Sequence, residues 1–179
     1  VVIDLLDDVN LTDGLVIGAG KNVTIQCQKE NPKTITMNSL GIITGRLEGG
    51  ISNVTFTNCM IDENVINHPE VQGENNGATT NLFTNTNLKL DHVTWTLKSS
   101  GDQIGKHGIY LNAETKLYIS NGSAVKISGF NSSRSSGLFQ DASDRTQSMS
   151  PVEIVIDNGS ELSISDCGYG GITVDEPKM

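Results

Sequence analysis

The chain is poor in aromatic residues, in basic residues and in long apolar runs. Of its 179 residues 4% are aromatic, and 12 Lys and Arg stand against 21 Asp and Glu, a formal net charge of −9. Nucleic acids and anionic membrane surfaces bind basic patches, so neither is expected as a partner. No stretch approaches the roughly 20 apolar residues that span a bilayer, so insertion into a membrane is not expected either.

Cysteine is also scarce, and its number is odd. Three cysteines without a C-x-x-C pair do not make a disulfide scaffold, and the three histidines fall at no zinc-ligand spacing. We therefore expect no metal and no cofactor. Two interpretations of the thiols stay open: small buried hydrophobic residues, or a single bridge between Cys27 and Cys59 on neighbouring repeats.

Helical periodicity is missing almost everywhere, and a repeat takes its place. Residues 117–130 read LYISNGSAVKISGF and residues 154–167 read IVIDNGSELSISDC, and the two blocks align without a gap at an offset of 37 residues. Each block consists of two short segments, apolar at every second residue, joined by the turn N-G-S. Such alternation is typical of strands with one face in a core, and a fixed period indicates a stacked repeat architecture.

Parts of this block recur along the whole chain. Its second segment predicts equivalent strands that begin at positions 23, 54, 88, 125 and 162, spaced by 31, 34, 37 and 37 residues. Its first segment aligns with Leu15, and a third segment opens on glycine at positions 41, 108, 137 and 171. Just after the second segment, four residues are expected to stack in the interior: Cys59, Val93, Phe130 and Cys167.

Three short strands per period, with no helix between them, favour a solenoid in which neighbouring coils bond at a spacing of about 4.8 Å. A β-propeller needs four strands per blade and periodic aromatic residues, and a β-sandwich would not repeat one turn at a fixed offset. We therefore predict an all-β parallel β-helix of about five three-strand coils with loop insertions, forming one domain over residues 1–179. Asn22, Asn53 and Asn87 precede the second segment in successive repeats, so their amides are expected to form a hydrogen-bonded ladder.

With its G-I-x-L, L-x-I-x-N-G-S and L-x-I-S segments, the three-strand coil resembles the right-handed parallel β-helix of the pectin-lyase-like superfamily. The strand–N-G-S–strand unit is similar to non-catalytic repeats of bacterial cell-surface adhesins. The resemblance covers nearly the whole chain and concerns the fold and the pattern of the repeats. It implies a right-handed helix and one of two functions: an enzyme that acts on polysaccharides, or an adhesive or structural stalk.

The enzymatic branch of that family has residues that this chain lacks. Polygalacturonases of this fold carry G-H-G-I, and Lys106-His107-Gly108-Ile109 is similar, but the accompanying N-T-D and R-I-K motifs are absent. Hydrolysis of a glycosidic bond needs two carboxyl groups roughly 5 to 9.5 Å apart, and the only adjacent Asp pair, Asp7-Asp8, lies in the N-terminal segment. A calcium-dependent lyase would need several oxygen ligands around Asp91, and the matching positions of neighbouring repeats carry no carboxylate. We expect no catalytic residue.

Function is expected where the repeat is interrupted, because loops on a rigid scaffold commonly carry binding residues. Segments 28–39, 60–80, 96–107 and 131–136 follow the same strand and should emerge on one side, whereas 140–151 leaves from another corner. We expect 60–80 and 96–107 to take part in binding. The ligand-binding candidates are Asp62, Glu63, His68, Glu70, Glu74, Trp95, Asp102 and His107.

Trp95, the only tryptophan, has two interpretations. It can stack on a sugar at the edge of a loop, or it can belong to the core, because it shares the strand parity of the inward Val93.

The sequence thus predicts a non-catalytic adhesive or structural domain of a secreted or cell-wall-attached bacterial protein, located outside the cell. Its loops would meet a host protein, a matrix protein or a glycan. The alternative is a polysaccharide lyase, a glycoside hydrolase or a carbohydrate-binding module of the same fold. The two ends of the chain, Val1 and Met179, lead us to expect a fragment of a larger surface protein.

Overall fold

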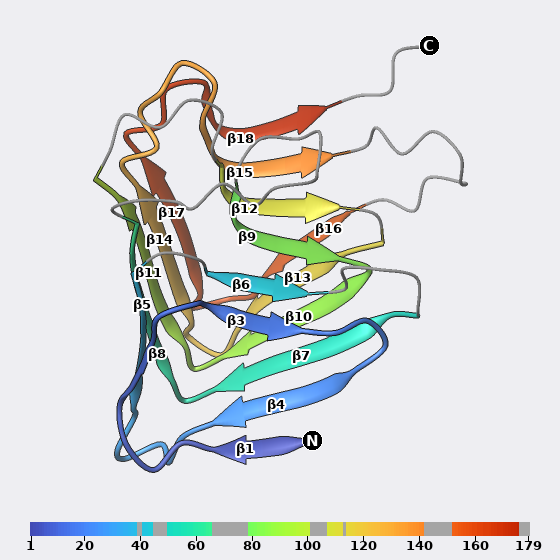
Figure 1. The fold of residues 1–179 in the computed structure, drawn as a ribbon, viewed down its shortest axis with the longest axis vertical. Coiled ribbons are helices and arrows are strands. Elements are labelled where there is room, and N and C mark those ends of the chain that lie inside the picture. The colour runs from blue at the N-terminus through green and yellow to red at the C-terminus, as the bar shows by residue number, and fades with distance from the viewer. Residues whose placement is uncertain are drawn as a thin grey trace.

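The protein is a right-handed parallel β-helix of six coils, each made of three strands. The computed structural model describes residues 1–38, 41–44, 50–65, 79–100, 107–112, 114–141 and 152–175. Figure 1 shows the coils stacked along the long axis, with β1 at one end and β18 at the other. The prediction of the fold class is confirmed, with six coils in place of about five.

Three parallel sheets, here called A, B and C, run the length of the stack. Sheet A contains β1 (Val2–Asp4), β4 (Asn22–Gln26), β7 (Ser52–Thr57), β10 (Thr86–Asp91), β13 (Lys116–Ser120) and β16 (Glu153–Ile156). Sheet B contains β2 (Val9–Leu11), β5 (Thr34–Met37), β8 (Met60–Val65), β11 (Thr94–Ser99), β14 (Ala124–Ser128) and β17 (Glu161–Ser165). Sheet C contains β3 (Leu15–Ile17), β6 (Ile42–Thr44), β9 (Thr79–Thr84), β12 (His107–Asn112), β15 (Ser136–Asp141) and β18 (Gly170–Asp175).

The core is built of columns of inward side chains, one residue from each coil. Alternating strands supply them, because every second side chain of a strand points to the same face. In sheet A one column runs through Ile25, Phe56, Leu90 and Ile119, all at most 4% exposed. Columns from all three sheets meet in a single hydrophobic cluster, which extends from coil to coil along the stack.

The repeat was predicted correctly in part and misassigned in part. The offset of 37 residues is confirmed, because Leu117 pairs with Ile154 and Val125 pairs with Leu162. The step from Leu88 to Val125 is wrong: Leu88 pairs with Leu117 in sheet A, and Val125 pairs with Trp95 in sheet B. The second segment of the block therefore belongs to a different sheet from the upstream strands that resemble it.

Two expected equivalences fail for the same reason. Leu15 lies in β3 of sheet C and pairs with Ile42, not in the sheet that contains Leu117. Cys59 and Val93 occupy the corner between sheets A and B, whereas Phe130 and Cys167 follow the strands of sheet B. The four residues thus form two separate corner positions.

The corner between sheets A and B depends on a left-handed residue. Asn58, His92 and Asn121 stand there in coils 3, 4 and 5, with φ of 56°, 54° and 55°. Asparagine tolerates this conformation better than most residues, which fits the Asn-rich turns of the sequence.

The asparagine ladder is confirmed on the outside of sheet A. Asn53 Nδ2 donates to Asn22 Oδ1 at 2.7 Å, and Asn87 Nδ2 donates to Asn53 Oδ1 at 2.9 Å. In both hydrogen bonds the donor lies one coil further from the N-terminus than the acceptor. The ladder therefore fixes the register of coils 2 to 4, which contain β4, β7 and β10.

The expected insertions are shorter than predicted, because each contains residues of a strand. β5 lies within 28–39, β8 opens 60–80 and β11 opens 96–107, and 131–136 ends in β15. Residues 66–78, 101–106 and 142–151 lie outside the described residues. The prediction that 60–80 is a loop insertion is therefore wrong for 60–65, which carries the buried Ile61 and Val65, and for 79–80, which begin β9.

Replacing Ile127 by Asp is expected to unfold the domain. Ile127 is 1% exposed, and a buried unpaired charge costs several kcal/mol. The control is Lys126→Asp at the exposed neighbouring position, which should change the free energy of unfolding by about 0.5 kcal/mol at most. Urea denaturation followed by circular dichroism measures both, and a cooperative, folded Ile127→Asp protein would contradict the assigned inward face.

Candidate functional site

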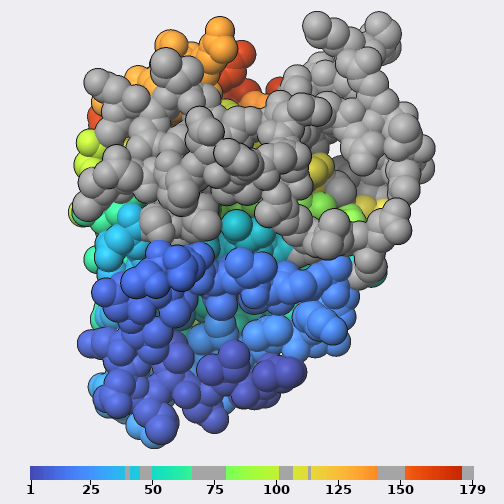
Figure 2. Space-filling model, viewed as in Figure 1, coloured from blue at the N-terminus to red at the C-terminus, as the bar shows by residue number. Residues whose placement is uncertain are grey.

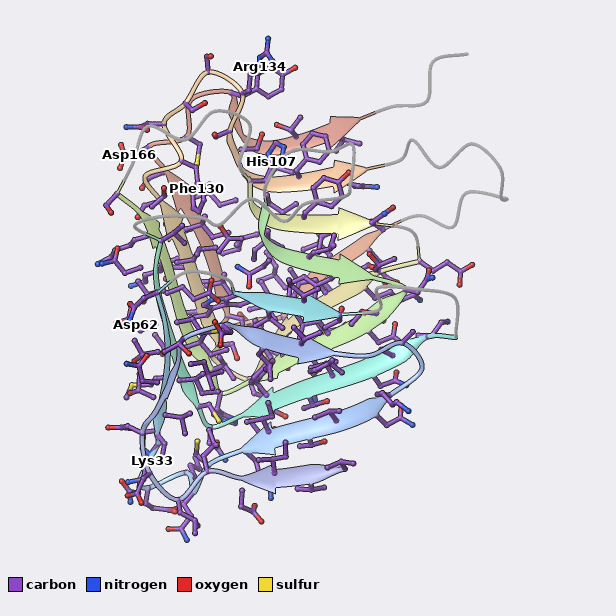
Figure 3. All side chains as sticks on the ribbon, in the orientation of Figure 1. Lys33, Asp62, His107, Phe130, Arg134 and Asp166 are labelled. Atoms are coloured by element: carbon purple, nitrogen blue, oxygen red, sulfur yellow. The ribbon has the colours of Figure 1, made fainter. Side chains whose placement is uncertain are left out.

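Four of the eight predicted ligand-binding residues fall in the described part of the chain. His68, Glu70, Glu74 and Asp102 lie outside it. The other four do not converge on one site. Asp62 is exposed on the outer side of sheet B, Glu63 and Trp95 are in the interior, and His107 is a buried residue that begins β12. Figure 3 shows the labelled Asp62 and His107 well apart, on different sheets.

Glu63 stands in an inward column that is otherwise apolar. Its Cα partners in neighbouring coils are Met37 and Leu97, and the side chain is 1% exposed. The strand pattern explains this position, because Ile61, Glu63 and Val65 share one parity and are all buried. That parity was visible in the sequence, but the interpretation of 60–80 as a loop concealed it.

Two hydrogen bonds from the core satisfy the buried carboxylate. Trp95 Nε1 donates to Glu63 Oε1 at 3.0 Å, and Asn81 Nδ2 donates to Oε2 at 2.9 Å. Asn81 in turn accepts from the Ile42 amide at 2.7 Å and donates to the Gly108 carbonyl at 3.1 Å. The carboxylate and the Asn81 amide thereby link sheets B and C across the interior.

Packing by Phe83 and the absence of a side chain at Gly41 make room for this network. The Trp95 ring is fully buried and packs edge-on against Phe83, with centroids 6.3 Å apart and planes at 81°. A side chain at Gly41 would collide with Asn81 and would come within 2.7 Å of Glu63 Oε2. Glycine at this position leaves the room that the polar pair occupies. Of the two interpretations of Trp95, core packing is the one that the structure supports.

Burial raises the pKa of Glu63 to about 7, against a usual value of 4.5. The hydrogen bonds from Asn81 and Trp95 act in the opposite direction, and the charge of Asp62 adds to the rise. Glu63 therefore titrates near neutral pH inside the core. Its side chain is 1% exposed and faces the interior of the stack.

His107 belongs to an aromatic cluster of sheet C. Its ring stacks on Phe139 with centroids 4.3 Å apart, and Tyr110 stacks on the same Phe139 at 5.1 Å. The Ser136 amide donates to His107 Nδ1 at 3.2 Å, which ties the ring to the next coil. The expectation of a loop residue is wrong here, since His107 is paired with Thr79 as the first residue of a strand.

The environment of His107 favours the neutral ring. Burial lowers its pKa to about 4, below the usual 6.5. A histidine that is 8% exposed and accepts a main-chain hydrogen bond serves to pack two coils together.

Asp91 is also engaged in the scaffold. Its carboxylate accepts from Asn121 Nδ2 at 2.8 Å, pairs with Lys89 Nζ at 3.1 Å and lies 2.9 Å from His92 Nδ1. Partial burial raises its pKa, but the contacts with Asn121, Lys89 and His92 outweigh that effect and hold the pKa below its usual value. Asp157, one coil further along, accepts a hydrogen bond from the Asn121 main-chain amide. Carboxylates thus connect three successive coils at this corner.

Within the described ranges, no three His, Cys, Asp or Glu side chains gather as metal ligands. The same part of the chain contains no helix of the length and apolar character that crossing a membrane requires.

The outside of sheet B carries a regular row of polar side chains. We call it the sheet B face and define it by the central outward row, which is exposed or half-buried throughout: Asn10, Thr36, Asp62, Thr96, Lys126 and Ser163. Neighbouring members are one coil apart, at about 4.8 Å. Thr96 lies at the centre, between the carboxylate of Asp62 and the ammonium group of Lys126. Of this row, only Asp62 was among the predicted site residues.

Comparisons of the chain with protein-family models, with curated proteins and with solved structures gave no match. The class of the protein, a right-handed parallel β-helix, is thus defined by its own strand pairing.

The contribution of Glu63 to stability is expected to fall as the pH rises through its titration, whereas the contribution of His107, with its lowered pKa of about 4, rises between about pH 4 and 6.5. The pKa of Glu63 is higher in the folded protein than in the unfolded chain, so protonated Glu63 favours the fold below about pH 4.5, and this contribution is lost as the pH rises through about 7. The shift corresponds to about 3 kcal/mol across that range. Urea denaturation at about pH 5, 6, 7 and 8 measures it.

Glu63→Gln should remove the Glu63 contribution and leave that of His107, so the difference between the wild-type protein and this variant measures Glu63. Asp62→Asn, one residue away on the exposed side of the same strand, should keep most of the Glu63 contribution, because the Asp62 charge is the smallest cause of the raised pKa. Equal slopes for the wild-type protein and Glu63→Gln would show that Glu63 does not titrate in this range.

Proposed function

We propose that the chain is a non-catalytic adhesive or structural β-helix domain of a secreted or cell-surface bacterial protein. Its partner is a glycan, a host protein or a matrix protein. The observation that supports this proposal most is that the acidic and histidine side chains with shifted pKa values have structural contacts. Glu63, His107 and Asp91 are all engaged in contacts that hold neighbouring coils together.

The sheet B face is the surface that we assign to the partner. Its row of hydroxyl, carboxylate, amide and ammonium groups has the donors and acceptors that sugar hydroxyls and extended protein segments bind. Strand pairing fixes the spacing of these groups, so little conformational entropy is lost when a ligand orders them. Segments 66–78 and 101–106 follow β8 and β11 of the same sheet, which is where the sequence predicted binding loops.

The net charge of −9 bears on the choice of partner. A strongly acidic domain repels polyanions at long range, so neutral glycans and basic protein segments are favoured over sulfated or uronic polysaccharides. The same negative charge disfavours pectin-like, uronic substrates such as those of the enzymes in the pectin-lyase-like superfamily.

A bulky residue at the centre of the sheet B face should block binding. We expect Thr96→Arg to weaken binding to the best ligand of a glycan and matrix-protein array by at least about tenfold, or 1.4 kcal/mol. The matched control is Thr55→Arg: both threonines are half-buried, outward and central in their sheets, and both changes add one positive charge. Thr55 lies on sheet A, so its replacement should leave the affinity within about twofold.

Three results would contradict parts of the proposal. Equal losses for the two variants would exclude the sheet B face. A blank array would exclude adhesion and leave a spacer. New reducing ends or unsaturated products from any polysaccharide incubated with the wild-type protein would exclude the non-catalytic function.

A further inference from the structure

Two thiols on neighbouring coils face each other at the corner between sheets A and B. Cys27 Sγ and Cys59 Sγ are 2.8 Å apart, and both residues belong to the hydrophobic cluster, at 7% and 1% exposure. Figure 3 labels Lys33 near this corner, and the Lys33 carbonyl lies 3.8 Å from Cys27 Sγ. We infer that Cys27 and Cys59 form a disulfide that joins coils 2 and 3.

The coil spacing and the position of the two sulfurs are compatible with such a bond. A disulfide needs Cα atoms about 4.4 to 6.8 Å apart, and neighbouring coils of a parallel stack are about 4.8 Å apart. The Cys27 amide donates to the Thr57 carbonyl at 3.0 Å, and Asn58 Nδ2 donates to the Cys27 carbonyl at 3.3 Å, so both segments are held in place. The sulfurs need to approach by under about 1 Å to reach the bonded distance of about 2.05 Å.

The left-handed Asn58 explains why the sulfurs meet although the two cysteines are not Cα partners. Gln26 pairs with Thr57, so Cys27 follows its strand directly, whereas Cys59 follows one residue later, after Asn58. This extra residue turns the chain of coil 3 at the corner and brings Cys59 back into the interior, next to Cys27 of coil 2.

The burial of the pair indicates when the bond forms. Burial and the neighbouring thiol of Cys27 raise the pKa of Cys59, so little thiolate is present in the folded protein. Cys27 lines an open pocket of about 430 Å³ together with Asp4, Leu6 and Asn31, whereas Cys59 does not line it. Oxidation therefore takes place while the coils are forming, or through Cys27 when this corner opens.

The oxidant that we assign is a small-molecule disulfide such as oxidised glutathione. The Cys27 thiolate attacks one of its sulfurs, forms a mixed disulfide and releases one glutathione thiolate, which takes up a proton. The Cys59 thiolate then attacks the Cys27 sulfur, forms the S–S bond and releases the second glutathione thiolate. The protein loses two protons and two electrons, and the oxidant gains them.

The bond would restrain the unfolded chain more than it changes the fold. It closes a loop between residues 32 positions apart, and bonds of this kind raise the melting temperature of a chain of this size by about 10 °C. Cys167, half-buried after β17, is an internal control because its Sγ is placed against the Ser165 carbonyl at 3.3 Å. The inference does not depend on the partner of the sheet B face.

The experiment is to refold the denatured, reduced full chain with and without a glutathione redox buffer. In the oxidised sample we expect a peptide pair linked through Cys27 and Cys59 in mass spectrometry without reductant. The same sample should melt about 10 °C higher than the reduced one. Cys167→Ser should behave like the wild-type protein, and Cys27→Ser with Cys59→Ser should melt at one temperature in both buffers.

The comparison of oxidised with reduced wild-type protein decides the matter even if the double variant does not fold. Alkylation of all three thiols in denaturant after oxidative refolding would overturn the inference. A linked peptide that contains Cys167 would overturn it as well.

Discussion

The register of the parallel strand ladders is the constraint on which the rest of this structure depends. Side chains alternate along a strand, so a slip of one residue between two coils would turn every inward side chain to the solvent. The asparagine ladder on sheet A and the left-handed corners at Asn58, His92 and Asn121 oppose such a slip. Once the register holds, even a carboxylate can occupy the core, because its donors are brought to it by the same stacking.

Much of the fold was predictable because its signals are local. Alternation and the N-G-S turn identify strands and corners within a few residues, which is why the offset between Leu117 and Ile154 was found. Alternation does not say to which sheet a strand belongs, and strands of sheets A and B carry the same pattern. Coils 3 and 4 turn from A to B through a single left-handed residue without N-G-S, so Val125 was paired with Leu88 rather than with Trp95.

The candidate site was harder to predict, because its contacts join distant parts of the chain. The parity of Ile61 and Val65 marks Glu63 as inward, but a template of apolar core positions gives no reason to place a carboxylate there. Asn81 becomes its partner only when β8 and β9 face each other across the interior of one coil, and no pattern within either strand contains that information. The sheet B face was hard to predict for the same reason, because each coil contributes a single residue to it and the register between coils decides which one.

The asparagine ladder has a consequence for the response of the molecule to electrolytes. In the described part of the chain its neutral amides join coils 2 to 4, whereas an ion pair, Lys116 with Glu153, joins coils 5 and 6. Mobile ions screen charged pairs at a surface and leave amide bonds nearly unaffected. A rise in ionic strength should therefore weaken the contact between Lys116 and Glu153 while the ladder keeps its hydrogen bonds.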